Sequence, residues 1–526
     1  YFKKISGHLH DFKIINDSLN FVIEDLSGLE KSGLNIQNLS ANTIISPSTM
    51  RFESLVLQTS NSHIKDFLQF KYSSYADFSE FITDVQIEAN FDESKVHTSD
   101  LALFSNTLKE YTEVLFANGK VTGTINNLRS EKLEISMSNH THFNGKIKIT
   151  GLPNTAKTYL DINAKILTST AREIAKLAKL DPVPQEFLAL GDIRYVGTFR
   201  GYFTDFSVKG EIHSSVGDVA TYITYKQLGT NNAGYAGILT SPDLDLGKLI
   251  GNKTIGTTSF DLQLAGSGLD AQSLNSSISG QIGHISYADY DYKNIVLDGK
   301  VALGLYEGDF KIQDPNFNLD FNGSLDISSE IPEIKVRTNV FALNLKALGL
   351  DSQDNILKFN GLVNLTGSEL DNITGSIDLD SFTMEKGDST YRLKDVKLTS
   401  EKNANYRQYS LKSDLAVVDL KGNFLLSEVD TLIEHIKHII YPSQFAKPML
   451  PIKSKNIASV ISIDTFQNIF KEFIPSAYFE SLFLDIEYDH TAGKIESTGG
   501  LTNFKYDIVS TPFIDLKISN GGDFTP

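Results

Sequence analysis

The feature that most constrains this sequence is the alternation of apolar and polar residues with a period of two. Leu133, Ile135 and Met137 alternate with Glu134 and Ser136. Successive side chains of a β-strand point to opposite faces of the sheet, so this segment predicts a strand with one apolar and one polar face. The same pattern recurs over the ranges 260–264, 317–321 and 482–486. Strands of this kind are typical of antiparallel sheets that have one solvated face.

Turn signals separate these segments, and only 13 prolines interrupt the chain of 526 residues. Examples are Asn144-Gly145, Asn322-Gly323, Lys421-Gly422-Asn423 and Thr498-Gly499-Gly500. A spacing of about 8–12 residues per strand would give roughly 40 strands. Because large open sheets twist and curl, we predict an all-β fold: a long, curled antiparallel meander with a few short amphipathic helices.

Three segments have the apolar spacing of a helix. The first, near 170–180, opens with a capping-box spacing at Thr170 and Glu173. The second, 428–441, carries an apolar stripe and stops before Pro442. That stripe consists of Val429, Leu432, Ile433, Ile436 and Ile440. The third, 464–474, is a candidate gate helix, with an ordinary core helix or a partner-binding face as alternatives. Its apolar residues are Phe466, Ile469, Phe470 and Phe473.

Similar patterns recur about 100 residues apart, which is typical of repeat proteins. The segment 244–249 resembles 343–348, and 290–295 resembles 391–396. A third match links 321–323 with 420–422. We therefore divide the chain into stacked modules rather than globular domains. The predicted modules are 1–150, 151–265 with the helix near 170–180, 266–365, 366–450 ending in the helix 428–441, and 451–526 with the helix 464–474.

Composition excludes several classes of function. The net charge is −17, which argues against nucleic acid and against anionic headgroup surfaces, since both attract clusters of Lys and Arg. The chain contains no cysteine, which excludes disulfides and thiolate chemistry. No segment reaches the 18 or more apolar residues of a membrane-spanning helix. We expect the sequence to be a portion of a longer protein, with any membrane anchor outside it.

No residue pattern indicates catalysis, so we predict no enzyme activity, no cofactor and no metal. The nucleophile elbow GxSxG, the Walker A loop and the HExxH motif are all absent from the sequence. The histidine pairs 8/10, 140/142 and 435/438 each lack an identifiable third ligand, whereas zinc needs three or four. Asp378 and Asp380 are interpreted as the solvent face of one strand rather than a pair of catalytic acids.

A sheet that curls toward its apolar face forms a trough that its own side chains cannot fill. Each methylene group buried there gains about 0.8 kcal/mol, so acyl chains of lipids suit such a trough. The contacts have no preferred direction, so a lipid could slide from strand to strand. The alternative is a β-sandwich, in which a second sheet covers the apolar face.

A family resemblance favours the trough. It is carried by spaced small and apolar residues over most of 30–500. The segments concerned are Leu190-Gly191-Asp192-Ile193, Gly197-Thr198-Phe199-Arg200-Gly201, Asp205-Phe206, Gly210 and Val216-Gly217-Asp218-Val219, with Leu55–Ser62, Asp77–Phe81 and Gly151-Leu152-Pro153 upstream. The chain resembles the TamB/AsmA-like family of bridge-like lipid-transfer proteins, in its Bacteroidetes type.

The resemblance implies a repeating β-groove (β-taco) fold, anchored in the inner membrane and crossing the periplasm. It also implies transport of phospholipid between the inner and outer membranes, or outer-membrane biogenesis as a translocation and assembly module beside a TamA-like barrel protein. The family's N-terminal anchor and C-terminal docking domain are not recognisable here.

We therefore expect a segment that conducts phospholipid acyl chains along an apolar groove. The predicted groove walls are Leu133, Ile135, Met137, Leu262, Leu264, Phe317, Leu319, Phe321, Leu482, Leu484 and Ile486. The alternative function is a periplasmic scaffold or chaperone for outer-membrane proteins, which would receive client strands. A stack of β-sandwiches without cargo is a third possibility.

Overall fold

The structure is a computed structural model, and it describes residues 2–103, 109, 111–137, 139–178, 180–229, 232–268, 273–403, 406–440, 442–446, 448, 452–464, 477–506 and 508–520. About 67% of the chain is strand and 10% is helix. The sheet is an antiparallel meander that does not close into a barrel. The predicted fold class, a long antiparallel meander with a few short helices, is therefore confirmed.

The chain forms two compact units: an N-terminal unit of residues 1–269 and 282–291, and a C-terminal unit of residues 270–281 and 292–526. The strands of the N-terminal unit are β1 (Phe2–Ile15), β2 (Ser18–Glu30), β3 (Asn35–Ser46), β4 (Thr49–Thr59), β5 (His63–Lys71), β6 (Gln86–His97), β7 (Val114–Thr124), β8 (Asn127–Met137), β9 (Thr141–Thr150), β10 (Tyr159–Thr170), β11 (Asp192–Tyr202), β12 (Asp205–Ser214), β13 (Gly217–Gln227), β14 (Ala233–Asp245) and β15 (Ile255–Ser267). The boundary between the units falls within β16 (Asn275–Tyr287).

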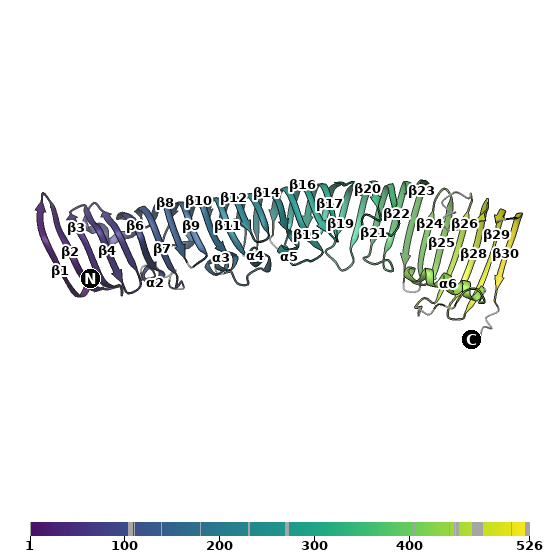
Figure 1. The fold of residues 1–526 in the computed structure, drawn as a ribbon, viewed down its shortest axis with the longest axis horizontal. Coiled ribbons are helices and arrows are strands. Elements are labelled where there is room, and N and C mark those ends of the chain that lie inside the picture. Colours follow the sequence, from purple (N-terminus) through teal and green to yellow (C-terminus); the bar gives the residue numbers. More distant parts are fainter. Residues whose placement is uncertain are drawn as a thin grey trace. The chain divides into compact units, whose positions relative to one another are not determined.

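The strands of the C-terminal unit are β17 (Tyr290–Ala302), β18 (Leu305–Gln313), β19 (Phe317–Asp326), β20 (Glu333–Asn344), β21 (Asn355–Thr366), β22 (Thr374–Lys386), β23 (Ser389–Lys402), β24 (Arg407–Lys412), β25 (Ala416–Asn423), β26 (Asn456–Ile463), β27 (Ala477–Tyr478), β28 (Ser481–Asp489), β29 (Lys494–Tyr506) and β30 (Val509–Ser519). Most strands in both units hydrogen-bond to the strands before and after them in the sequence, as Figure 1 shows. The described part of the chain holds 30 strands rather than about 40. The predicted turns were wrong, because Gly145, Gly323, Gly422 and Gly499 lie inside β9, β19, β25 and β29, so the strands run on through these glycines.

The helices are short and lie at the two rims of the sheet, where the strands end (Figure 1). They are η1 (Tyr75–Glu80), α1 (Phe81–Asp84), α2 (Thr98–Leu101), η3 (Thr155–Lys157), α3 (Ala171–Ala178), α4 (Gln185–Ala189), α5 (Leu246–Ile250), η4 (Leu426–Glu428) and α6 (Val429–Ile440). The two predicted helices near 170–180 and 428–441 correspond to α3 and α6. The predicted helix 464–474 lies outside the described residues, apart from Asp464.

One hydrogen bond of the predicted capping box forms at the start of α3. The backbone N–H of Glu173 donates to Thr170 Oγ1 at 3.1 Å. The carboxylate of Glu173 accepts from the hydroxyl of Thr141 in β9. The side chain that the sequence pattern assigns to helix capping thus also joins α3 to the sheet.

The repeat that the sequence indicates has a structural period of six strands. Leu244 and Leu343 lie near the ends of β14 and β20, while the second match links β17 with β23 and the third links β19 with β25. The equivalent turns also share a cap. Asp245 accepts from Lys248 N–H at 2.9 Å, and Asn344 accepts from Ala347 N–H at 3.0 Å.

In the N-terminal unit, the sheet bends where glycines face each other across neighbouring strands. Gly197 of β11 pairs with Gly210 of β12. A Cβ atom on Gly210 would lie 2.3 Å from the carbonyl oxygen of Val196, so no larger residue fits there. The ring of Tyr195 packs beside this pair, and its hydroxyl donates to the Thr198 carbonyl at 2.9 Å. Burial of this phenol raises the pKa of Tyr195 to about 12.

The same arrangement recurs in the C-terminal unit. Gly299 of β17 pairs with Gly308 of β18, and the ring of Tyr306 lies beside them. The hydroxyl of Tyr306 donates to the Asp309 carbonyl at 2.6 Å. Glycine inside a strand marks a bend or a close approach of backbone, and a neighbouring aromatic ring covers the backbone that the glycines leave bare. Each unit therefore has a built-in site of curvature.

Candidate functional site: an apolar trough in the sheet

In the C-terminal unit, one face of the sheet carries a continuous row of glycine and aliphatic residues. Each member is the antiparallel partner of the next, so all of them lie on the same face. We call this set the central row. It consists of Gly299, Gly308, Gly323, Val336, Val363, Ile377, Leu398, Leu411, Val418, Ile461, Leu484, Gly499 and Leu516.

The N-terminal unit has an equivalent row that joins two of the predicted groove residues. Leu133 of β8 and Leu262 of β15 both belong to it. From β8 to β15 the row is Leu133, Gly145, Ala164, Gly197, Gly210, Thr221, Leu239 and Leu262. Two segments that are far apart in the sequence therefore present their leucines to the same face.

The remaining predicted groove residues lie in the strands where the alternation places them. Ile135 and Met137 share the face of Leu133 in β8, and Leu264 shares that of Leu262 in β15. In β28 the alternation is clear: Leu482, Leu484 and Ile486 are buried or half-buried, whereas Phe483 and Asp485 are exposed. Phe317, Leu319 and Phe321 are half-buried in β19. Leu319 pairs with Ile312 and Val340, and Phe321 stacks on Phe310 with ring centroids 5.0 Å apart.

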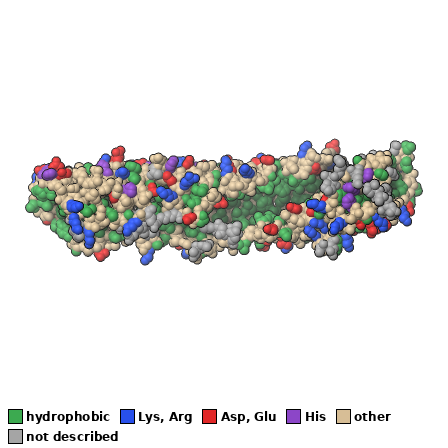
Figure 2. Space-filling view, turned by 90° about the horizontal axis from the view of Figure 1, so that it is seen from below, with side chains coloured by type: hydrophobic (Ala, Val, Ile, Leu, Met, Phe, Trp, Pro, Cys, Tyr) green, Lys and Arg blue, Asp and Glu red, His purple; other side chains and the backbone are tan. Residues whose placement is uncertain are grey.

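Part of this apolar face in the C-terminal unit is uncovered. A cavity of about 430 Å³ lies against strands β21–β25. Its walls include Ile377, Leu398, Leu411 and Val418 of the central row, and it is also lined by Leu426. Leu398 remains 38% exposed although it belongs to an apolar row. Figure 2 shows a hollow lined with hydrophobic side chains over this part of the unit. Within the described residues the strands of this unit form one sheet, and no second sheet covers the hollow.

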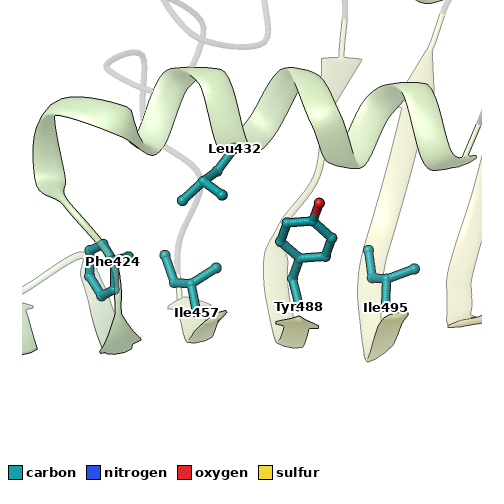
Figure 3. Packing of buried hydrophobic residues seen from close by; sticks show 5 residues of the cluster. All are labelled: Phe424, Leu432, Ile457, Tyr488 and Ile495. Carbon is teal, nitrogen blue, oxygen red and sulfur yellow. The ribbon is translucent and has the colours of Figure 1, made fainter. Parts of the chain in front are cut away.

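Helix α6 covers the same face further along the unit, at β25–β29. Leu432 on the helix is 1% exposed and points toward Phe424 and Ile457; Tyr488 and Ile495 complete the buried cluster under the helix (Figure 3). The helix thus shields these apolar side chains from water. At this end of strands β25–β29 the apolar face is therefore covered by protein.

One residue of the predicted stripe of α6 is misplaced. Ile433 is 44% exposed and faces away from the sheet, whereas Ile439 packs on the cluster together with Val429, Ile436 and Ile440. An ideal helix turns by about 100° per residue, so Ile433 lies about 100° from Leu432 on the helix surface. Only one of the two can face the centre of the contact.

Two carboxylates hold the start of α6 against the sheet. Glu428 accepts hydrogen bonds from the backbone N–H and the hydroxyl of Ser454, at 2.9 and 2.6 Å, and from the N–H of Lys453. Burial raises the pKa of Glu428, but these hydrogen bonds outweigh it, and the net pKa lies below its usual value. Asp371, in the loop between β21 and β22, accepts from the N–H and the hydroxyl of Ser427.

Sequence reasoning missed two polar residues at this trough, Arg407 and Tyr409. Both lie in β24, two residues apart, on the face of Leu411. The hydroxyl of Tyr409 and one terminal nitrogen of Arg407 are buried without a hydrogen-bond partner. The signal was present in the sequence, because Arg407, Tyr409 and Leu411 occupy alternate positions of one strand. An arginine in register with a leucine on an apolar face is unusual.

The described residues contain no group of three or more His, Asp or Glu side chains that could hold a metal ion. Asp378 forms an ion pair with Lys397 at 3.1 Å. The four apolar residues of the candidate gate helix, Phe466, Ile469, Phe470 and Phe473, lie outside the described residues. None of the helices that the structure describes is long and apolar enough to cross a membrane.

Comparison with known proteins finds no family, no curated protein and no solved structure that matches this chain.

Proposed function

We propose that this chain conducts phospholipid acyl chains along the apolar trough of its sheet. The observation that carries the proposal is the central row of the C-terminal unit, which borders the uncovered cavity at β21–β25. A row of aliphatic side chains facing water is unfavourable by about 25 cal/mol for each Å² of exposed apolar area. An acyl chain lying on the row removes that area from water, and it removes its own area as well.

The arrangement suits movement better than storage. Neighbouring members of the central row lie on adjacent strands, which are about 4.8 Å apart. Consecutive positions along the row are all apolar or glycine, so an acyl chain that advances by one strand exchanges one apolar contact for another. Apolar contacts have no preferred direction, and the free energy of the lipid then changes little from strand to strand.

The resemblance to TamB/AsmA-like proteins extends the proposal to a place. It favours a periplasmic segment that is anchored in the inner membrane by residues outside this sequence and carries phospholipid between the inner and outer membranes. A TamA-like outer-membrane barrel is then a candidate partner.

The test is lipid transfer between donor and acceptor vesicles, with charged substitutions in the trough. We expect Leu262→Arg and Leu319→Asp to fold and to block transfer, because an unpaired charge beside an acyl chain costs several kcal/mol. Gln263→Arg is the matched control, since Gln263 is exposed on the opposite face and receives the same charge. Equal transfer by Leu262→Arg and Gln263→Arg would overturn the proposal.

Photo-crosslinkers at Leu262 and Leu319 separate this proposal from the scaffold or chaperone alternative. Lipid adducts are expected if the trough carries acyl chains. Adducts with polypeptides alone would favour a trough that receives strands of client proteins, by the main-chain pairing that open sheet edges allow.

A further inference from the structure

The cavity at β21–β25 combines an apolar interior with polar groups at one rim. Apolar walls with a few well-placed polar groups, and a volume of about 300–1,000 Å³, are typical of small-molecule sites in proteins. The volume here is about 430 Å³. Leu370 and Leu426 line the cavity at the rim where β21, β23 and β25 end. Asp371 follows Leu370 at the same rim.

Two of these polar groups lack partners in the protein. The hydroxyl of Tyr409, which lines the cavity, is buried without a hydrogen bond. One terminal nitrogen of Arg407 is buried in the same way. A buried polar atom left without a partner costs about 1–3 kcal/mol, and native proteins seldom leave two such atoms side by side. Arg407 and Tyr409 face the trough from the same strand, so a single ligand could satisfy both.

The charge of Arg407 identifies one part of that ligand. A guanidinium group offers several N–H donors in one plane, which match the oxygens of phosphate. Tyr409 adds a hydroxyl donor deeper along the strand. Tyr409 lines the cavity, and Arg407 lies two residues before it on the same face of β24, so the two side chains offer donors for an oxyanion along one line toward the rim.

Asp371 identifies a second part. Burial raises the pKa of Asp371, but the hydrogen bonds from Ser427 and the positive charge of Arg407 outweigh it, and the net pKa lies below its usual value. Ser427 donates two hydrogen bonds to Asp371 and holds it at the rim. The rim therefore presents a separated positive and negative charge, which is the complement of a headgroup that carries a phosphate and an amine.

We propose that Arg407 and Tyr409 bind the phosphate of a zwitterionic phospholipid, whose amine faces Asp371 and whose acyl chain occupies the cavity. This inference rests on the proposed function, and it adds a fixed resting point for the headgroup to a trough that is otherwise uniform. Helix α6 lies next to this point and covers the continuation of the trough, so a lipid bound there would stand at the end of the open segment.

The experiment compares three soluble probes that share one acyl chain: lysophosphatidylethanolamine, lysophosphatidylglycerol and a monoacylglycerol. Their binding to the full chain is measured by calorimetry. We expect the zwitterionic probe to bind tightest. Arg407→Gln should weaken its binding by about ten-fold or more, since one charge-assisted hydrogen bond corresponds to that factor. Binding of the monoacylglycerol should not change.

Tyr409→Phe gives a second readout that a structural role would not produce. It removes a buried hydroxyl that has no protein partner, so the lipid-free variant should melt no lower than the unmodified chain, while its binding of the zwitterionic probe weakens. Arg392→Gln is the matched control, because Arg392 is exposed in the neighbouring strand β23. It should leave the affinity for all three probes unchanged.

The outcomes separate the two proposals. If the unmodified chain binds all three probes equally and Arg407→Gln changes nothing, the headgroup site is refuted while the acyl-chain trough stands. If none of the probes binds, the proposed function fails together with the site. A melting temperature that falls in Tyr409→Phe would also count against a ligand-binding role for the hydroxyl.

Discussion

Placing the same charge at an open and at a covered position of the trough tests whether the apolar face is uncovered. Leu398 of β23 is 38% exposed, whereas Ile457 of β26 is 8% exposed beneath α6. Full burial of a leucine contributes about 1.5–3 kcal/mol. Leu398→Asp should therefore cost about 1–2 kcal/mol, because the aspartate can keep water around its carboxylate.

Ile457→Asp should cost much more. It removes a buried aliphatic side chain, which costs about 2–5 kcal/mol for a change to alanine, and it leaves an unpaired carboxylate under the helix. We expect a loss of about 4 kcal/mol or more, with detachment of α6 from Tyr488 and Ile495.

Hydrogen exchange resolved by peptide segment is the appropriate assay. Strands that contact only their neighbours can unfold in parts, so protection measured segment by segment locates a change that a melting temperature averages over the whole chain. Protection should fall strongly over 429–440, 456–463 and 481–489 in Ile457→Asp, and it should change little over 389–402 and 407–412 in Leu398→Asp. Equal losses of protection in the two variants would mean that the face at β23 is covered, and the reasoning on the trough would be wrong.

Three further predictions follow from the packing. The pKa of Glu428 is lowered in the folded chain, so the ionised carboxylate stabilises the fold above its usual pKa of 4.5, and this stabilisation is lost as the pH falls below that value. After correction for the pH dependence of the intrinsic exchange rate, the amides of α6 should therefore be less protected at pH 4 than at neutral pH. Glu428→Gln should remove this pH dependence. Leu432→Ala should weaken the docking of α6 by about 2–5 kcal/mol, whereas Ile433→Ala on the exposed side should change it little, as measured by the same exchange experiment. Gly210→Ala should lower the melting temperature of the N-terminal unit because its Cβ would lie 2.3 Å from a carbonyl oxygen, while Gly229→Ala, with open space around it, serves as the control and should not.

The sequence alone predicts well which side chains of a given strand lie on the same face of the sheet. In β28 the side chains of Leu482, Leu484 and Ile486 follow their alternation, since the direction of each side chain depends only on its own strand. What the pattern could not predict is which strands share a row. Leu133 and Leu262 belong to one row across eight strands, and their register depends on bulges such as the one between Ala164 and Leu167.

The candidate headgroup site shows a second limit. Arg407 and Tyr409 stand on the apolar face of a short strand, and Asp371 lies in a loop more than thirty residues earlier. Only tertiary packing brings these residues to one rim, so no local pattern marks them as a group. The exposure of Ile433 has the same origin, because the contact between α6 and the sheet selects one side of a broad apolar stripe.

The antiparallel order of the strands also governs how such a sheet could change in length. A strand pair joined by a tight turn returns the backbone to the rim where it started. Duplication of a whole hairpin would therefore lengthen the trough and leave every later helix on its own side. Insertion of one strand would instead send the following helices to the opposite rim. We expect natural relatives of different length to differ by even numbers of strands.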